Sequence, residues 1–323
     1  MKIRKTYSYS RYVCGSFLMI NDPYGRPVSS LRISITQRCD LNCFYCHKEG
    51  EDYKASTEMT PEEIERIVRV ATSFGIRKVK LTGGEPLLRG EALEIVHRIS
   101  SIPLVREVAM TTNGVHLKEL AKALKENGLK RVNVSLCALK PETYKTITGT
   151  DVINRVIEGV GEAARVGLSP IKLNMVVLKG VNEDQVWSMI DFAKENKLIL
   201  QLIEFESPDD EDDDYKRYHS NLAEIEAELG KMAEKTTVRR MQNRRKYFLE
   251  NGVEVEVVRP MHNTKFCRNC NKLRITSDGK FKPCLFRTDN LIDFLAPMRN
   301  GVSDEVLKNL FIKAVENRRP YFT

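Results

Sequence analysis

Short strand-like runs that alternate with helical segments constrain the fold of this 323-residue chain more than any other feature. Helical patterns at 60–75, 116–128 and 182–196 lie between such runs. Consecutive parallel strands need a crossover, usually a right-handed helical one, so this alternation predicts an α/β fold. We expect a partial (β/α)6 TIM-like barrel, because the two further units of a closed eightfold barrel are not evident. The six strand-like runs are 32–36, 78–82, 107–111, 131–135, 171–177 and 198–205.

The helix expected at 60–75 carries its own start and stop signals. Thr60 can cap its N-terminus, Pro61 suits the first helical position, and Glu63 completes a capping box. Gly75 is expected to end it. This segment therefore predicts one well-delimited outer helix of the barrel.

The pattern changes after residue 205. An acidic run, DDEDDD at 209–214, interrupts the alternation and is expected to form a loop. We divide the chain into a barrel domain at 1–205 and a C-terminal extension at 206–323. Within the extension we expect helices at 219–230 and near 302–317, and strands at 245–250 and 253–258.

Composition and charge narrow the class of protein. The net charge is +8, which suits a polyanionic ligand such as a nucleotide or nucleic acid, although no long basic block favours nucleic acid. No run is long and apolar enough to span a membrane, and the first twenty residues lack the pattern of a signal peptide. We therefore expect a cytoplasmic protein whose clustered cysteines are metal ligands. Cys14 and Cys137 match no motif and are expected to be small buried residues.

Three cysteines in CDLNCFYC follow the first strand, where barrel enzymes place active-site loops. Cys39, Cys43 and Cys46 have unequal gaps, of three residues and then two. A zinc site normally repeats a two-residue gap in two pairs, so zinc is the weaker interpretation. Three thiolates on a four-iron cube would leave one iron open to another ligand.

A second cysteine group lies in the extension. Cys267 and Cys270 form a CxxC pair, and SDGK at 277–280 is typical of a hairpin turn that would return Cys284 to their side. The alternative is a zinc ribbon, for which His262 is the nearest fourth ligand.

The first group resembles the motif of the radical S-adenosylmethionine (radical SAM) superfamily, with Tyr45 as the aromatic residue before the third cysteine. GGEP at 83–86, TTNG at 111–114 and Ser135 match family positions around SAM. The resemblance implies a [4Fe–4S] cluster whose open iron binds the amine and carboxylate of SAM, which is then cleaved to a 5′-deoxyadenosyl radical. The implied SAM-binding residues are Tyr45, Gly84, Glu85, Thr112, Asn113 and Ser135.

From about residue 20 onward the chain resembles the GTP 3′,8-cyclase (MoaA) family of molybdenum cofactor biosynthesis. Its C-terminal signature appears here as Cys267, Cys270, Asn271, Lys272, Leu273, Arg274, Pro283, Cys284 and Leu285. The resemblance implies a second [4Fe–4S] cluster that binds the guanine of GTP. It further implies hydrogen abstraction from the ribose C3′ and attack of that carbon on C8, which gives (8S)-3′,8-cyclo-7,8-dihydroguanosine 5′-triphosphate.

The same resemblance assigns GTP contacts and partners. Lys272 replaces the arginine common in the family, Gln201 and Glu206 stand where bacterial members usually have Arg and Met, and the last residues read RRPYFT where many members have two glycines. Expected partners are GTP, an electron donor and the downstream cyclic pyranopterin monophosphate synthase, with a homodimer as a further expectation and without membrane or nucleic acid. The expected GTP-binding residues are Arg32, Lys80, Thr111, Lys172, Lys272 and Arg274.

Two other functions are compatible with parts of this sequence. One is a radical SAM enzyme with an auxiliary cluster that modifies a peptide, although such enzymes usually carry more C-terminal cysteines. The other is a zinc-ribbon protein that binds nucleic acid, which leaves Cys39–Cys46 and GGEP without a role.

Overall fold

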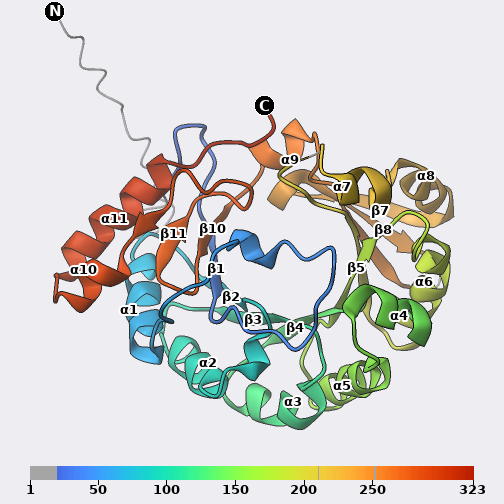
Figure 1. The fold of residues 1–323 in the computed structure, drawn as a ribbon, viewed down its shortest axis with the longest axis horizontal. Helices are drawn as coiled ribbons and strands as arrows, with labels where there is room; N and C mark the ends of the chain where they lie inside the picture. The colour runs from blue at the N-terminus through green and yellow to red at the C-terminus, as the bar shows by residue number, and fades with distance from the viewer. Residues whose placement is uncertain (1–19, 210, 251) are drawn as a thin grey trace, which may run out of the picture.

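The computed structural model describes residues 20–209, 211–250 and 252–323, so Cys14 lies outside the described residues. Their strands form one twelve-stranded sheet whose eight central strands are parallel and curve around a common centre (Figure 1). In spatial order the parallel strands are β10 (Lys272–Ile275), β1 (Ser30–Ser34), β2 (Lys78–Thr82), β3 (Glu107–Thr112), β4 (Arg131–Ser135), β5 (Lys172–Val177), β6 (Ile199–Glu204) and β9 (Glu254–Val258).

The six predicted strand–helix units are confirmed as β1 to β6, and the barrel is partial, as expected. The extension does more than pack on this barrel, because it adds one parallel strand at each edge. Antiparallel strands then continue the sheet on both sides, and no ladder joins the two outermost strands within the described residues. These outer strands are β11 (Lys280–Lys282), β12 (Ile292–Asp293), β8 (Arg244–Leu249) and β7 (Ala233–Arg239).

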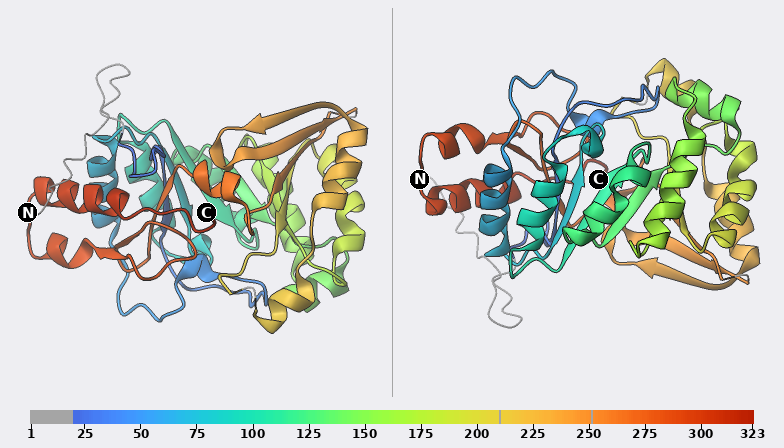
Figure 2. Two further views of the ribbon diagram at one scale, coloured as in Figure 1. Left: turned by 90° about the horizontal axis from the view of Figure 1, so that it is seen from above. Right: turned by 90° about the horizontal axis from the view of Figure 1, so that it is seen from below.

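Helices cover the outside of the curved sheet (Figures 1 and 2). Their buried faces are apolar, and no helix in the described ranges is long and apolar enough to cross a membrane. The outer helices of the barrel are α1 (Pro61–Thr72), α2 (Ala92–Ser100), α3 (Leu117–Glu126), α4 (Pro141–Thr148), α5 (Ile153–Arg165) and α6 (Val186–Glu195). The extension adds the helices α7 (Asp213–Tyr218), α8 (Ala223–Met232), α9 (Thr264–Arg268), α10 (Leu295–Arg299) and α11 (Asp304–Glu316).

The predicted start of α1 is confirmed in detail. The Thr60 hydroxyl accepts from the Glu63 backbone N–H at 3.2 Å, and the Glu63 carboxylate accepts from the Thr60 N–H at 2.8 Å. The helix ends at Thr72, three residues before Gly75, which adopts φ +82° in the turn into β2.

The acidic run was predicted to be a loop, and this was wrong for its last residues. The α7 helix begins at Asp213, and the Asp212 carboxylate caps it by accepting from the Asp214 and Tyr215 backbone N–H groups. The helix predicted at 219–230 begins later, at Ala223. An aspartate-rich run with one residue free to cap can start a helix, because carboxylates are favourable in the first turn.

A buried ion cluster joins the two ends of the described chain. Arg318 is fully buried, lies 3.1 Å from the Asp22 carboxylate and donates from Nη2 to the Cys270 carbonyl at 2.6 Å. Arg26 lies 2.7 Å from the same carboxylate and donates to the Cys267 carbonyl at 2.9 Å. The residues before β1 and after α11 therefore hold the loop that carries the CxxC pair.

Replacing Arg318 by leucine should destabilise the protein by about 3–5 kcal/mol, because Asp22 would keep a buried charge with one partner fewer. Guanidinium unfolding monitored by circular dichroism measures the change. Arg319→Leu is the matched control, because Arg319 is exposed. Equal stability of the two variants would contradict the role given to this cluster.

Candidate active site

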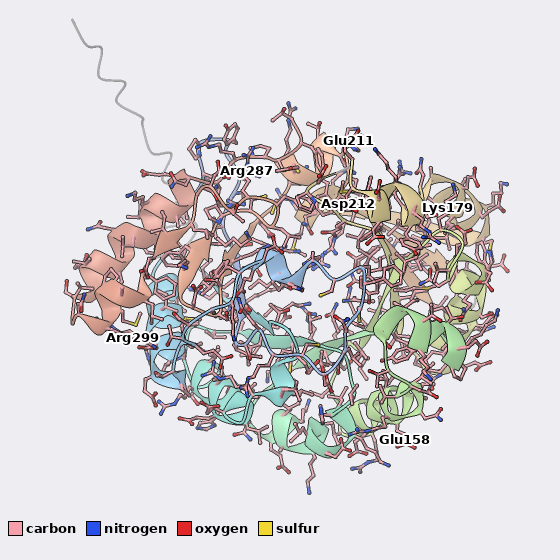
Figure 3. The ribbon with its side chains drawn as sticks, viewed as in Figure 1. Glu158, Lys179, Glu211, Asp212, Arg287 and Arg299 are labelled. Atoms are coloured by element: carbon pink, nitrogen blue, oxygen red, sulfur yellow. The ribbon has the colours of Figure 1, made fainter. Side chains whose placement is uncertain are left out.

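A cavity of about 1190 Å³ occupies the interior of the barrel. All but one of the eighteen residues expected to bind clusters, SAM or GTP line it, and the exception is Glu85. By contrast, Figure 3 shows the labelled Glu158 and Arg299 on the outer rim of the molecule. The fold therefore gathers the predicted set around one cavity.

The two cysteine groups approach this cavity from opposite ends. Cys39, Cys43 and Cys46 follow the end of β1, whereas Cys270 comes two residues before the start of β10. Since β10 runs parallel to β1, the end of one strand lies far from the start of the other. The antiparallel β10–β11 hairpin is confirmed, with its turn at 276–279, one residue before the predicted 277–280, and it returns Cys284 to the end that carries Cys270.

The glycines of GGEP hold the first cysteine loop in place. Gly84 donates from its N–H to the Thr36 carbonyl at 2.8 Å, and the Glu85 N–H donates to the Arg38 carbonyl at 2.7 Å. A Cβ on Gly84 would lie 2.2 Å from the Arg38 carbonyl oxygen, so only glycine fits. A Cβ on Gly83, which adopts φ +149°, would likewise lie 2.3 Å from the Thr36 carbonyl oxygen. The backbone of both glycines therefore packs directly against residues 36–38, which precede Cys39.

Glu85 does not line the cavity, but its side chain holds residues that do. Its buried carboxylate accepts from the Leu87 N–H at 2.9 Å, the Thr112 hydroxyl at 2.8 Å and the Asn113 N–H at 2.6 Å. Burial raises the pKa of Glu85 to about 7, although these hydrogen bonds favour the charged form. The side chain thereby fixes the TTNG segment, which does line the cavity.

Two residues that sequence reasoning missed connect the first cysteine loop to β3. Asp40, between the first two cysteines, accepts from the Asn113 amide at 2.7 Å and lies 3.0 Å from the His116 imidazole. The only sequence signal was the position of Asp40 next to Cys39. Its partners lie more than seventy residues later.

The three thiols of the first loop lie close enough to affect one another. Burial, and next the neighbouring Cys46 and Cys39 thiols, raise the pKa of Cys43 to about 12. At the second group, burial raises the pKa of Cys270, but nearby Arg318, Lys272 and Arg26 outweigh it and the pKa is lowered. Both groups offer thiol donors beside an open cavity, which fits iron–sulfur ligation with a free position.

The alternative of a zinc ribbon finds no support in the geometry. The His262 ring packs 5.0 Å from the ring of Phe322. No three or more His, Cys, Asp or Glu side chains of residues 20–209, 211–250 and 252–323 are placed to hold a single metal ion. A four-iron cube is larger than one ion and takes ligands that stand further apart. The seven cysteines of the described ranges are free thiols, and Cys137 is buried as expected.

The cavity wall is strongly cationic. Five glutamates offset fourteen lysines and arginines: Arg26, Arg32, Arg77, Lys78, Lys80, Arg131, Lys172, Arg239, Arg240, Arg244, Lys246, Lys272, Arg274 and Arg319. Burial, and next the charge of Arg131, lowers the pKa of Lys80 well below its usual value. Such an excess of positive charge around one cavity favours a polyanionic ligand.

Two buried carboxylates organise these cations. Glu49 lies 3.3 Å from Arg32 Nε and accepts from Arg274 Nη1 at 3.1 Å, and these arginines hold the pKa of Glu49 at about 2 against the effect of burial. Glu256 accepts from Lys172 at 2.7 Å and from Gln201 at 2.6 Å. Lys80 and Lys172 both line the cavity and therefore face the barrel interior, as predicted.

Some polar atoms of the wall make no hydrogen bond. The Thr111 hydroxyl is buried and makes none within the described residues, and neither does the buried Arg32 Nε–H, although it lies 3.3 Å from the Glu49 carboxylate. Unpaired buried donors are costly, so they indicate positions where a bound molecule supplies the acceptor. Both belong to the residues expected to bind GTP.

Gly84→Ala should displace the first cysteine loop, because the added Cβ collides with backbone, and should lower stability by about 1–3 kcal/mol. Iron content after anaerobic reconstitution should fall toward that of a chain without Cys39, Cys43 and Cys46. Gly90→Ala is the matched control, because a Cβ there meets nothing within 4 Å. Full iron content in Gly84→Ala would disprove this role for Gly84.

Comparison with known proteins agrees with this geometry. Residues 33–193 match the radical SAM superfamily, and residues 198–323 match the family described as Molybdenum Cofactor Synthesis C. The chain is 55% identical to a probable GTP 3′,8-cyclase of Thermococcus kodakarensis, over 94% of this chain and 100% of that protein. It is 52% identical to a probable GTP 3′,8-cyclase of Pyrococcus abyssi, over 94% and 100% of the two chains.

Solved structures share the fold at low identity. Streptococcus suis SuiB bound to S-adenosylmethionine has a TM-score of 0.62 at 19% identity, with 83% of this chain and 63% of that chain covered. The enzyme anSMEcpe with bound AdoMet has a TM-score of 0.61 at 18% identity, with 90% and 81% covered. Membership of the superfamily implies SAM and a [4Fe–4S] cluster as cofactors. Because relatives at 52% and 55% identity span nearly its whole length, the chain belongs to the GTP 3′,8-cyclase family of radical SAM enzymes.

Proposed function

We propose that this chain converts GTP to (8S)-3′,8-cyclo-7,8-dihydroguanosine 5′-triphosphate, the first step of molybdenum cofactor biosynthesis. The observation that carries the proposal is the pair of cysteine groups at opposite ends of one cationic cavity. One end would generate the oxidant and the other would hold the substrate. The named relatives support the same activity.

At the first end, Cys39, Cys43 and Cys46 would hold the SAM-binding [4Fe–4S] cluster. When bound, this cluster and SAM supply a 5′-deoxyadenosyl radical. The residues around them would orient SAM, with Asn113 held by Asp40 and by Glu85. The direct contacts would come from Tyr45, Gly84, Thr112, Asn113 and Ser135, while Glu85 supports them from below.

At the second end, Cys267, Cys270 and Cys284 would hold a second [4Fe–4S] cluster, to which the guanine would bind. Buried Arg318 and Arg26 hold the carbonyls of this loop and add positive charge beside its thiols. That charge favours the thiolate form that a cluster requires. On this proposal residues 206–323 provide the substrate half of the site, and the division after residue 205 stays a prediction.

Between the two ends, the cationic wall would bind the triphosphate. Arg32, Lys80, Lys172, Lys272 and Arg274 all line the cavity. Arginine and lysine form charge-assisted hydrogen bonds with phosphate, which are about twice as strong as neutral ones. The Thr111 hydroxyl, which has no hydrogen bond within the described residues, is free to donate to the same ligand.

The placement of both cysteine groups in one cavity has a chemical role. A radical formed at the first end would act on a ribose held in the same cavity. Fixed positions at both ends also remove the entropy cost of bringing the two reactants together. The reaction needs an electron donor, and its product would pass to cyclic pyranopterin monophosphate synthase.

Anaerobic reconstitution followed by addition of dithionite and SAM tests the proposal. We expect formation of 5′-deoxyadenosine to depend on GTP, and we expect mass spectrometry to find an isomer of GTP in the same sample. SAM cleavage that is indifferent to GTP would leave a radical SAM enzyme with a different substrate.

Substitutions in the two cysteine groups should differ in their effects on SAM cleavage and on GTP cyclisation. Cys39→Ser should abolish SAM cleavage, because the first cluster loses a ligand. Cys284→Ala should retain part of the SAM cleavage and lose GTP cyclisation. Both products are quantified by liquid chromatography. Normal cyclisation by Cys284→Ala would show that the second group does not hold the substrate.

Arg274→Ala should raise the KM for GTP roughly ten- to a hundredfold, the loss of one charge-assisted contact, with little change in the KM for SAM. Arg165→Ala is the control, because Arg165 lies on α5 away from the cavity and pairs with Glu162. Equal effects of Arg274→Ala on both substrates would argue against a triphosphate contact.

A further inference from the structure

The β7–β8 hairpin of the extension brings two arginines face to face. Arg239, the last residue of β7, is the direct cross-strand partner of Arg244, the first residue of β8. Like charges directly opposite each other destabilise a strand pair. Both side chains also line the cavity. The pair therefore needs anions on the cavity side of the hairpin.

A single buried carboxylate neutralises only part of the positive charge of this pair. Glu256 on the neighbouring β9 lies with Oε1 3.2 Å from Arg239 Nη1 and 3.1 Å from Arg244 Nε. Its Oε2 is already occupied by Lys172, at 2.7 Å, and by Gln201, at 2.6 Å. One negative charge thus serves three cations, and two positive charges remain to be offset.

The other carboxylates near the two arginines do not offset the remaining positive charge. Glu254 lies 2.5 Å from Lys246 and is paired with it. Glu206 also lines the cavity, but burial lowers the pKa of Arg244 to about 10, and Glu256 opposes this shift more than Glu206 does. The Nε–H of Arg244 is buried and has no aligned acceptor within the described residues, in spite of its distance to Glu256. A buried guanidinium with an unused donor indicates that an acceptor arrives with a ligand.

The position of the pair is set by the turn that joins the two strands. Gln242 in this turn donates from its N–H to the Asn269 carbonyl at 2.8 Å and accepts from Lys272 at 3.1 Å. Asn269 lies between the cysteines of the CxxC pair. The hairpin tip, which follows Arg239 and precedes Arg244, is thereby tied to the second cysteine loop.

We propose that Arg239 and Arg244 form an additional phosphate-binding pair of the substrate site, supplied by the C-terminal hairpin and held in register by Glu256. This inference rests on the proposed function, since it takes the nucleoside triphosphate as the ligand. It extends the expected set of GTP contacts from the barrel strands and β10 to β7 and β8. The pair contributes to the preference for a triphosphate over shorter phosphate chains.

Binding of GTP and GDP to the reconstituted holoenzyme tests the pair. Titrations are made by calorimetry with SAM present and without reductant, so that no turnover occurs. We expect Arg239→Gln and Arg244→Gln to weaken GTP binding roughly ten- to a hundredfold, the loss of a charge-assisted phosphate contact. The ratio of the GDP and GTP dissociation constants should fall toward one, while the dissociation constant of SAM stays unchanged.

Arg245→Gln is the matched control. Arg245 follows Arg244 on the same strand, is exposed and is absent from the cavity wall, since successive strand residues face opposite sides. It should bind GTP as the unaltered protein does. Thermal melts of all three variants accompany the titrations. Arg244 is buried, so Arg244→Gln can fail to fold. In that case Arg239→Gln provides the test, because the Arg239 side chain is 32% exposed. A purely structural pair would lower the melting temperature and leave the GDP-to-GTP ratio unchanged, and that result would overturn the proposal.

Inorganic tripolyphosphate separates this inference from the proposed function. If the unaltered protein binds no GTP, the proposed function fails, and tripolyphosphate then tests the anion site alone. Binding of tripolyphosphate that is lost in Arg239→Gln but kept in Arg245→Gln would support the pair. Absent binding, or equal binding by these two variants, would overturn it.

Discussion

The parallel pairing of β10 with β1 is the constraint on which the site depends. Arg32 is the register partner of Arg274, and Ser30 is the partner of Lys272. This pairing sets strands about 240 residues apart in sequence side by side, so that the loop after one strand and the loop before the other lie at opposite ends of the barrel. The distance between the two cysteine groups follows from strand direction. A sheet ladder holds that distance far more firmly than a flexible linker could.

The second organising principle is the neutralisation of buried charge. Glu49 and Glu256 each stand between cations from different strands, Glu49 joining β1 to β10 and Glu256 joining β5 to β7 and β8. A buried carboxylate without partners would be costly, and a cluster of cations without one would repel itself. Each carboxylate therefore keeps its cations in place while leaving a surplus of positive charge toward the cavity. The arrangement suits a ligand that brings several negative charges.

Much of the barrel and of the cysteine chemistry could be predicted from the chain alone. The six strands, the capping box of α1 and the hairpin before Cys284 depend on local patterns of burial, capping and turn residues. The strand positions of Lys80 and Lys172 also predicted that both would face the interior. The role of the GGEP glycines was harder to predict. The same glycine freedom serves close contact with a ligand or with a neighbouring loop, and the structure shows contact with the residues before Cys39.

The sequence by itself determined which chemistry this protein carries, because thiol spacing and strand–helix alternation are local properties of the chain. Only the tertiary structure decided how the parts combine. It placed β9 and β10 at the two edges of the barrel, joined Asp40 to Asn113, and brought Arg239 opposite Arg244 beside Glu256. These outcomes depend on strand partners that lie far apart in sequence. Their pairing is decided by the total burial and charge balance of the folded chain, which no short segment encodes.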